Sequence, residues 1–307
     1  MERVLEAEMD GVLERWRLGA GGAAPPCLLI EVPHGADQRA HFDALAARLR
    51  GPFPADLHAF FHVNTDVGAV EVGFAVAAGL VARDPRRSVG LLRCLLPRTF
   101  IDCNRALEQP AGDLQRGGLT AAMAPYVRDA DDQALLHALH TAYVGAVHAE
   151  VDAACAAGGL VLIPHTYAPR TVGISAVDDD IVERLRECWA PDQVERWPLR
   201  PPVDLIVETP SGEDLSPPGA AAALVQAYAT LGVEAVRGGT YTLHPATMAY
   251  QSARRWPGQT LCLELRRDLL MKSWAPFSPM EADPAQVERL AQPLVDVLDA
   301  RLRAAGR

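Results

Sequence analysis

The sequence predicts an α/β fold in which helices cover a sheet. Three short apolar runs, at 27–32, 160–163 and 203–207, have the composition of strands that are buried on both faces of a sheet. Segments with helical patterns alternate with these runs along the chain, as in α/β proteins. Because there is no internal repeat and no strong boundary, we expect residues 1–307 to form a single domain.

The expected elements follow in chain order. Apolar residues near helical spacing predict an amphipathic N-terminal helix over 1–18. Further helices are expected at 39–50, 67–83, 130–157, 217–231 and 284–304. Strands are expected at 27–32, 88–96, 99–102, 160–163, 203–207 and 260–265. The irregular, proline-punctuated segment 170–200 is expected to be an insertion or a lid.

The composition excludes several classes of protein. The 307 residues are 49% hydrophobic and 22% charged, which is an ordinary globular balance. A formal net charge of −10 argues against nucleic acid as a partner. The cysteines are scattered without a CxxC pair, and neither an apolar signal core nor an uninterrupted apolar run of membrane-spanning length occurs. We therefore expect a cytoplasmic protein without disulfides and without a membrane partner.

Two predicted strands end in a proline–histidine pair, at His34 and at His165. Ligands in open α/β sheets bind beyond the carboxyl ends of the strands. A single histidine in such a place is more simply explained by a hydrogen bond to the backbone. Two histidines from separate strand ends, however, are a common way to hold zinc. The sequence therefore indicates a candidate zinc site.

A catalytic zinc site with two histidines usually has a carboxylate as its third protein ligand. Asp66 is the leading candidate, although it is equally placed to cap the helix that begins near Val67. Asp37, three residues after His34, competes with it, and Glu71 is a weaker alternative.

Polar residues are concentrated in the segment from Arg98 to Arg105. Period-2 alternation places Asp102 and Asn104 on one face of the expected strand. An arginine fork with a neighbouring amide can bind a carboxylate. Alternatively, the segment is a solvated edge in which Asp102 pairs with Arg98 or Arg105.

The last predicted strand carries a glutamate. Alternation places three leucines on one face and Cys262, Glu264 and Arg266 on the other. A glutamate within such a strand is costly unless it is paired, so Glu264 either pairs with Arg266 or acts as a general base beside a metal-bound water. A glycine-rich loop at 237–241 is weaker evidence of a site.

Taken in chain order, these segments resemble the N-formylglutamate amidohydrolase family over about residues 28–271. The matching motifs are Val32-Pro-His34-Gly, Thr65-Asp66, Arg98 with Ile101-Asp-Cys-Asn-Arg105, Pro-His165-Thr, Arg237-Gly-Gly-Thr-Tyr241 and Leu263-Glu-Leu-Arg266. The resemblance implies a single catalytic domain with a mixed, mostly parallel sheet and helices on both faces, similar to the zinc carboxypeptidases (phosphorylase/hydrolase-like). It also implies a zinc-dependent hydrolase that cleaves the linear amide C–N bond of a small N-formyl or N-acyl amino acid.

The resemblance further implies roles for individual residues. The implied zinc ligands are His34, Asp66 and His165. Glu264 would activate water and Arg98 would polarise the scissile carbonyl. The implied substrate-binding residues are Asn104, Arg105, Tyr241 and Arg266.

Two positions depart from the family pattern. Ile163-Pro164 stands before the second histidine where the family usually has Asp-Ala, so the acid of that motif is missing, and Asn64 replaces the first aspartate of Asp-Thr-Asp. Two alternative functions therefore stay open, namely a carboxypeptidase-like peptide hydrolase and a non-catalytic binding protein on the same fold.

Overall fold

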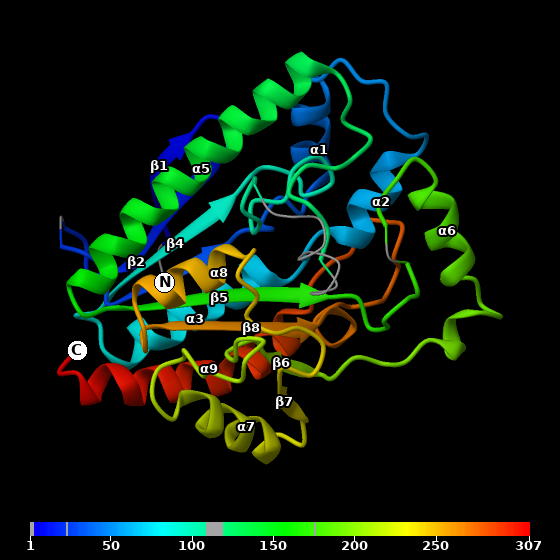
Figure 1. Ribbon diagram of the computed structural model, residues 1–307. Coiled ribbons are helices and arrows are strands. Elements are labelled where there is room, and N and C mark those ends of the chain that lie inside the picture. Colours follow the sequence, from blue (N-terminus) through cyan, green and yellow to red (C-terminus); the bar gives the residue numbers. More distant parts are fainter. Residues whose placement is uncertain (1–2, 23, 109–118, 175) are drawn as a thin grey trace.

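The computed structural model describes residues 3–22, 24–108, 119–174 and 176–307. Among these residues, eight strands form one sheet in the order β1-β2-β4-β3-β5-β8-β6-β7 (Figure 1). The strands are β1 (Val4–Met9), β2 (Leu13–Gly19), β3 (Leu28–Val32), β4 (Ser88–Cys94), β5 (Leu160–Tyr167), β6 (Val203–Leu205), β7 (Ala235–Arg237) and β8 (Thr260–Arg266). The central strands β4, β3, β5 and β8 are parallel, whereas β2 and β6 run antiparallel to their inner neighbours. The predicted α/β class with a mixed, mostly parallel sheet is confirmed.

Helices cover both faces of this sheet. The hydrophobic cluster on one face includes residues of α3 (Ala69–Arg83), α7 (Ala220–Thr230) and α9 (Pro284–Ala304). The cluster on the other face includes residues of α1 (Arg39–Ala46), α2 (Leu57–Asn64), α5 (Ala130–Ala156), α6 (Ile181–Cys188) and α8 (Met248–Arg255). Two short 3₁₀ helices lie at Val194–Arg196 and Arg267–Leu269.

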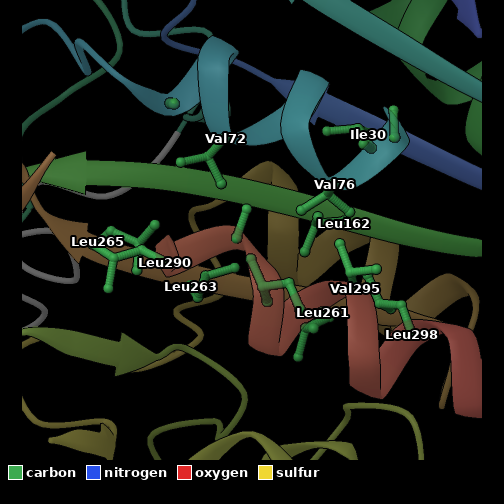
Figure 2. Close-up of a cluster of buried hydrophobic side chains, with 14 of the residues drawn as sticks. Ile30, Val72, Val76, Leu162, Leu261, Leu263, Leu265, Leu290, Val295 and Leu298 are labelled. Carbon is green, nitrogen blue, oxygen red and sulfur yellow. The ribbon is translucent and has the colours of Figure 1, made fainter. Parts of the chain in front are cut away.

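Side-chain alternation along the central strands builds the two halves of the core. Figure 2 shows Ile30, Leu162 and Leu263 meeting the valines and leucines of α3 and α9. The intervening residues of the same strands belong to the opposite cluster. Burial of one such side chain contributes about 1.5–3 kcal/mol. Glu264 alternates with the leucines of β8 and so faces away from the α3–α9 layer.

The predicted N-terminal helix over 1–18 is wrong. The described part of this segment is a hairpin of β1 and β2, and β2 joins the sheet by pairing with β4. Asp10-Gly11 forms the turn, with Gly11 at φ 65°. An Asp-Gly pair between two strands is a strong hairpin signal, and it outweighs the loose helical spacing of the apolar residues. Residues 1–2 lie outside the described part of the chain.

The strand predicted at 160–163 does not stop before Pro164. Strand β5 continues through Pro164 and His165 to Tyr167, pairing with β8 over its whole extension. The amide of Leu160 donates toward β3, to Cys27, and that of Val161 donates toward β8, to Gln259. By alternation, the nitrogen of Pro164 faces the β3 side, where the pairing has ended at Leu162. Proline is therefore tolerated because no ladder hydrogen bond is lost.

The predicted strand at 99–102 is also wrong. The amides of Phe100 and Ile101 both donate to the carbonyl of Pro97, which makes this segment a turn. The Asp102 carboxylate then accepts the amide of Asn104 at 2.9 Å, an Asx turn of the kind aspartate favours. The chain therefore folds back on itself here, so polar groups two or three residues apart meet around Asp102.

One stretch of the described residues, Leu57–Arg83, is long and apolar enough to cross a membrane by length and composition alone. Its most apolar window has a mean hydropathy of 1.5 and is 72% buried inside the fold. It comprises α2 and α3, which are core helices.

A fully buried carboxyl group in β3 makes the stability of the fold sensitive to pH. Glu31 is completely buried, accepts a hydrogen bond from the Tyr143 hydroxyl at 3.1 Å and leaves Oε2 without a partner. Burial raises the pKa of Glu31 from 4.5 to about 7. Between these values the unfolded chain releases the proton while the folded chain keeps it, so this group lowers stability as pH rises.

We predict that Glu31→Gln removes this loss. The advantage of the variant over the wild type in unfolding free energy grows between pH 4.5 and pH 8, by about 3 kcal/mol at most. Denaturant unfolding of both proteins at several pH values measures it. Parallel stability curves would contradict the assignment.

Candidate functional site

The carboxyl ends of the central strands bring the candidate site residues together. His34 follows β3 by two residues, in a turn where the Gly35 amide donates to the Val32 carbonyl. His165 and Glu264 are directly opposite each other in the β5–β8 pairing. Asp66 lies between α2 and α3, and the preceding Thr65 hydroxyl anchors this connection by donating to the Ala36 carbonyl at 2.9 Å.

Three buried polar atoms form a small triangle. Asp66 Oδ2 lies 3.0 Å from His34 Nδ1 and 2.9 Å from His165 Nδ1, and the two ring nitrogens are 3.2 Å apart. All three side chains are at most 4% exposed. Their ligand atoms can hold one metal ion between them. The carboxylate does not cap α3, because the N-cap of that helix is Gly68.

The competing carboxylates lie elsewhere. Asp37 pairs with Arg93 at 2.8 Å, and neither Asp37 nor Glu71 lines the cavity described below. Of the three candidates for the carboxylate beside the histidines, the structure brings only Asp66 into the triangle.

The charge state of Asp66 suits this position. Burial alone would raise its pKa, but the charges and hydrogen bonds of His34 and His165 outweigh burial and hold the pKa of Asp66 well below its usual range. Arg98 and Arg267 add positive charge at 3.5 and 3.9 Å from Oδ1. The carboxylate is therefore ionised, as a metal ligand must be.

A second layer of polar groups orients the histidines. His34 Nε2 donates to Asp102 Oδ1 at 2.8 Å, the carboxylate–histidine contact that commonly fixes a ligating ring. The Asn104 amide nitrogen is 3.4 Å from His165 Nε2, while Asn104 Oδ1 has no partner. With the amide turned over, Oδ1 would accept the proton of Nε2.

Asp102 also lies beside Arg98 and Arg105, the two arginines of the segment Arg98–Arg105. Arg98 Nη2 donates to it at 3.0 Å, and Arg105 Nη2 lies 3.9 Å away. Burial opposes the charge of Asp102, but these arginines and His34 hold its pKa well below the usual range. The sequence left open whether this segment is an ion-paired edge or a carboxylate grip, and the ion pair with Arg98 does form. Arg105 Nε remains buried without a partner.

Glu264 faces the triangle from β8. Burial raises the pKa of Glu264 to about 7, although the neighbouring His165 favours the ionised form. Its Oε2 is buried without a partner. The alternative pairing of Glu264 with Arg266 does not form, since Arg266 Nε donates to Asp268 at 2.9 Å. A carboxyl group with a pKa near neutrality can accept and return a proton.

A cavity of about 630 Å³ opens onto these groups. It is lined by the predicted residues His34, Asp66, Arg98, Asn104, Arg105, His165, Tyr241 and Glu264. Arg266, also predicted to bind substrate, does not line it. Three residues that the sequence pattern did not single out as site residues, Asp102, Arg200 and Arg267, do line it.

Two buried side chains, which the sequence motifs do not reveal, hold the loop before Tyr241 and the backbone of Arg105 in place. The fully buried Asp204 accepts the amides of Gly239 and Thr240 at 2.8 and 2.6 Å, which fixes the loop that carries Tyr241. On the opposite side, His140 of α5 donates to the Arg105 carbonyl at 2.8 Å. A lone aspartate or histidine in a strand or helix gives no signal for such a role in a single sequence.

Comparison with solved structures identifies the fold. The chain is similar to N-formylglutamate amidohydrolase from Ralstonia eutropha JMP134, with a TM-score of 0.56 and 18% identity, covering 94% of this chain and 97% of that one. It shares the fold of that enzyme. A gene product from Agrobacterium tumefaciens is similar too, with a TM-score of 0.53 and 15% identity, covering 96% of each chain.

A metallo-carboxypeptidase from Burkholderia cenocepacia aligns with a TM-score of 0.37 and 11% identity, over 94% of this chain and 61% of that one. No protein-family model matches the sequence. No curated protein matches it either.

We predict that Asp102→Asn weakens metal binding at the triangle about 10- to 100-fold, because His34 loses the carboxylate that orients it. Competition with a chelator for Zn²⁺ measures the change. Asp299→Asn is a matched control, since Asp299 is a buried, arginine-paired carboxylate on α9. Equal affinities in the two variants would contradict the role of Asp102.

Proposed function

We propose that this protein is a metal-dependent hydrolase that cleaves the amide bond of an N-acyl amino acid. The observation that carries the proposal is the buried triangle of His34, Asp66 and His165, open to a cavity and faced by Glu264. The shared fold with N-formylglutamate amidohydrolase supports the same reaction class.

The triangle fits zinc. Zinc–ligand distances of about 2.0–2.1 Å in a tetrahedral site place neighbouring donors roughly 3.3 Å apart. The three donor separations of 2.9, 3.0 and 3.2 Å are slightly shorter than this value. Two histidines and one carboxylate are also the donor set of catalytic zinc sites, which keep a position free for water. When bound there, zinc would acidify that water and polarise the substrate carbonyl.

Glu264 is the proposed proton carrier. With a pKa near 7 and a free oxygen, it would accept a proton from the attacking water and pass it to the leaving nitrogen. The water oxygen forms a bond to the carbonyl carbon, the C–N bond breaks, and a carboxylic acid and a free amine result. No other co-reactant is needed.

Arg98 is the proposed stabiliser of the carbonyl oxygen. Its side chain is 25% exposed, lines the cavity and lies 3.4 Å from His34 Nδ1 through Nη1. Asp102 holds the guanidinium in place at 3.0 Å. A preorganised cation at this position would stabilise the negative charge that develops on the oxygen during attack.

Arg105 is the proposed binding site for the substrate carboxylate. It is 7% exposed, and its Nη1 donates to the Asn104 carbonyl at 3.0 Å. A buried guanidinium with an unpartnered Nε is costly unless a ligand pairs with it. A carboxylate matches its fork. Tyr241 lines the same cavity and would cover the bound substrate.

We predict that Glu264→Gln lowers kcat at least about 100-fold while the bound zinc remains stoichiometric, because only the proton acceptor is lost. Turnover of formyl- and acyl-amino acids and elemental analysis measure the two effects. Glu31→Gln is the control, since Glu31 is a fully buried glutamate of the same sheet that does not line the cavity. Full activity of Glu264→Gln, or of metal-stripped protein, would refute the mechanism.

We predict that Arg105→Gln lowers kcat/KM about 10- to 100-fold for an acyl-amino acid, the value of one charged hydrogen-bonded contact. The wild type should lose a similar factor when the substrate carboxylate is replaced by a carboxamide. The variant should not discriminate between the two substrates. If Arg105→Gln still prefers the carboxylate by the wild-type factor, another cation binds it.

A substrate panel that includes short peptides separates the acyl-amino acid reaction from a carboxypeptidase-like one. Tight binding without turnover in zinc-replete buffer would instead favour a binding protein on this fold.

A further inference from the structure

Beyond the triangle of His34, Asp66 and His165, the cavity extends into the space between α2 and α6. The six apolar side chains that line this part, which we call the α2–α6 chamber, are Phe60, Val63, Val172, Val177, Leu185 and Trp189. Phe60, Val63 and Leu185 belong to one buried hydrophobic cluster, and the other three are partly buried and pack against it. In Figure 1, α2 and α6 lie side by side beyond the carboxyl end of β5, and the two helices pack together. One part of the cavity is therefore lined by apolar side chains that are packed in place by the fold.

The chamber begins beside the metal triangle. Arg267 connects the two, because its Nη1 donates to the Val63 carbonyl at 2.9 Å and its Nη2 to the Thr166 carbonyl at 3.0 Å. Thr166 directly follows His165. A group bound at the triangle consequently has the chamber as its next neighbour.

The backbone of the proposed carboxylate site is held by different helices. The Arg105 carbonyl is held by α5, and Arg105 pairs with Thr247 at the start of α8. Arg98, in contrast, belongs to the α2 side, since the adjacent Thr99 hydroxyl donates to the Asn64 side chain at 3.0 Å. A substrate with its carboxylate at Arg105 and its scissile carbonyl at Arg98 therefore directs its acyl group into the chamber.

A formyl group would leave this space filled with water. The cavity of about 630 Å³ comprises the triangle, the arginines and the chamber together, and the one carbon and one oxygen of a formyl group are too few atoms to contact all six chamber side chains. The six chamber side chains carry no ionisable group. Displacing water from such walls is favourable only for an apolar occupant.

We propose that the acyl group of the substrate is apolar and larger than formyl, an aliphatic chain of medium length or an aromatic acyl group. This inference rests on the proposed function. Water would supply its oxygen to the acyl carbon and a proton to the amine, so the products are the free apolar carboxylic acid and the amino acid.

The test uses the zinc-loaded, full-length protein and a series of substrates that differ only in the acyl group. Formyl, acetyl, butanoyl and hexanoyl groups are each attached to L-leucine and to L-glutamate. We expect kcat/KM to rise about fourfold for each added methylene until the chamber is full. In parallel, calorimetry measures binding of the same series to Glu264→Gln, which keeps the chamber but turns over poorly.

Two variants examine the chamber itself. Val177→Trp narrows the chamber and should abolish the rise in kcat/KM from the acetyl to the hexanoyl substrate. Val4→Trp is the matched control, because Val4 is 49% exposed on β1. Val177→Thr, which keeps the shape, should reduce the gain per methylene even if the tryptophan variant fails to fold.

The outcomes separate this inference from the proposed function. Best cleavage and tightest binding of the formyl compounds would overturn the inference and leave the hydrolase intact. Tighter binding of longer chains without any cleavage would support the chamber and overturn the hydrolase. Binding that does not depend on chain length overturns the inference whatever the result for hydrolysis.

Discussion

The site depends on one buried carboxylate oxygen, Asp66 Oδ2, which lies within 3.0 Å of two imidazoles that come from different strands. A buried charge of this kind is stable only if it is paired and hydrogen-bonded. Almost every polar group around it serves that need. Asp102 orients His34, and Arg98 and Arg267 place positive charge beside Asp66. The same arrangement places three possible metal-ligand atoms, Asp66 Oδ2 and the Nδ1 atoms of His34 and His165, within 3.2 Å of one another.

The parallel sheet brings these side chains together without backbone strain. Because β3, β5 and β8 are parallel, their carboxyl ends share an edge, and His34, His165 and Glu264 reach it without strained backbone. Strand β5 extends beyond β3, which lets Pro164 sit in a central strand and places His165 opposite Glu264. The two histidines and Glu264 are thus positioned by central strands of the sheet, and strands hold site residues more precisely than loops do.

Much of the central architecture follows from the sequence. The apolar runs that form β3, β5 and β8 and the long periodic segments of α3, α5 and α9 carry strong local signals. The hairpin of β1 and β2 is not predicted because charged residues blur its period. Helices of only eight residues carry weak local signals, so α1 is predicted whereas α2, α6 and α8, of the same length, are not. Among site residues, Arg266 was misplaced, since Arg266 turns away from the cavity to Asp268 at the end of β8.

The sequence by itself predicted two site histidines at strand ends, a nearby aspartate and a glutamate in the last strand. Polar and charged side chains in such buried places lower stability unless they are paired or bind a ligand. The sequence could not choose among Asp66, Asp37 and Glu71, or decide what Asp102 contacts. Those choices depend on distances between segments up to 131 residues apart, such as His34 and His165. The apolar chamber likewise exists only after α2 and α6 pack together, because neither helix encloses space alone.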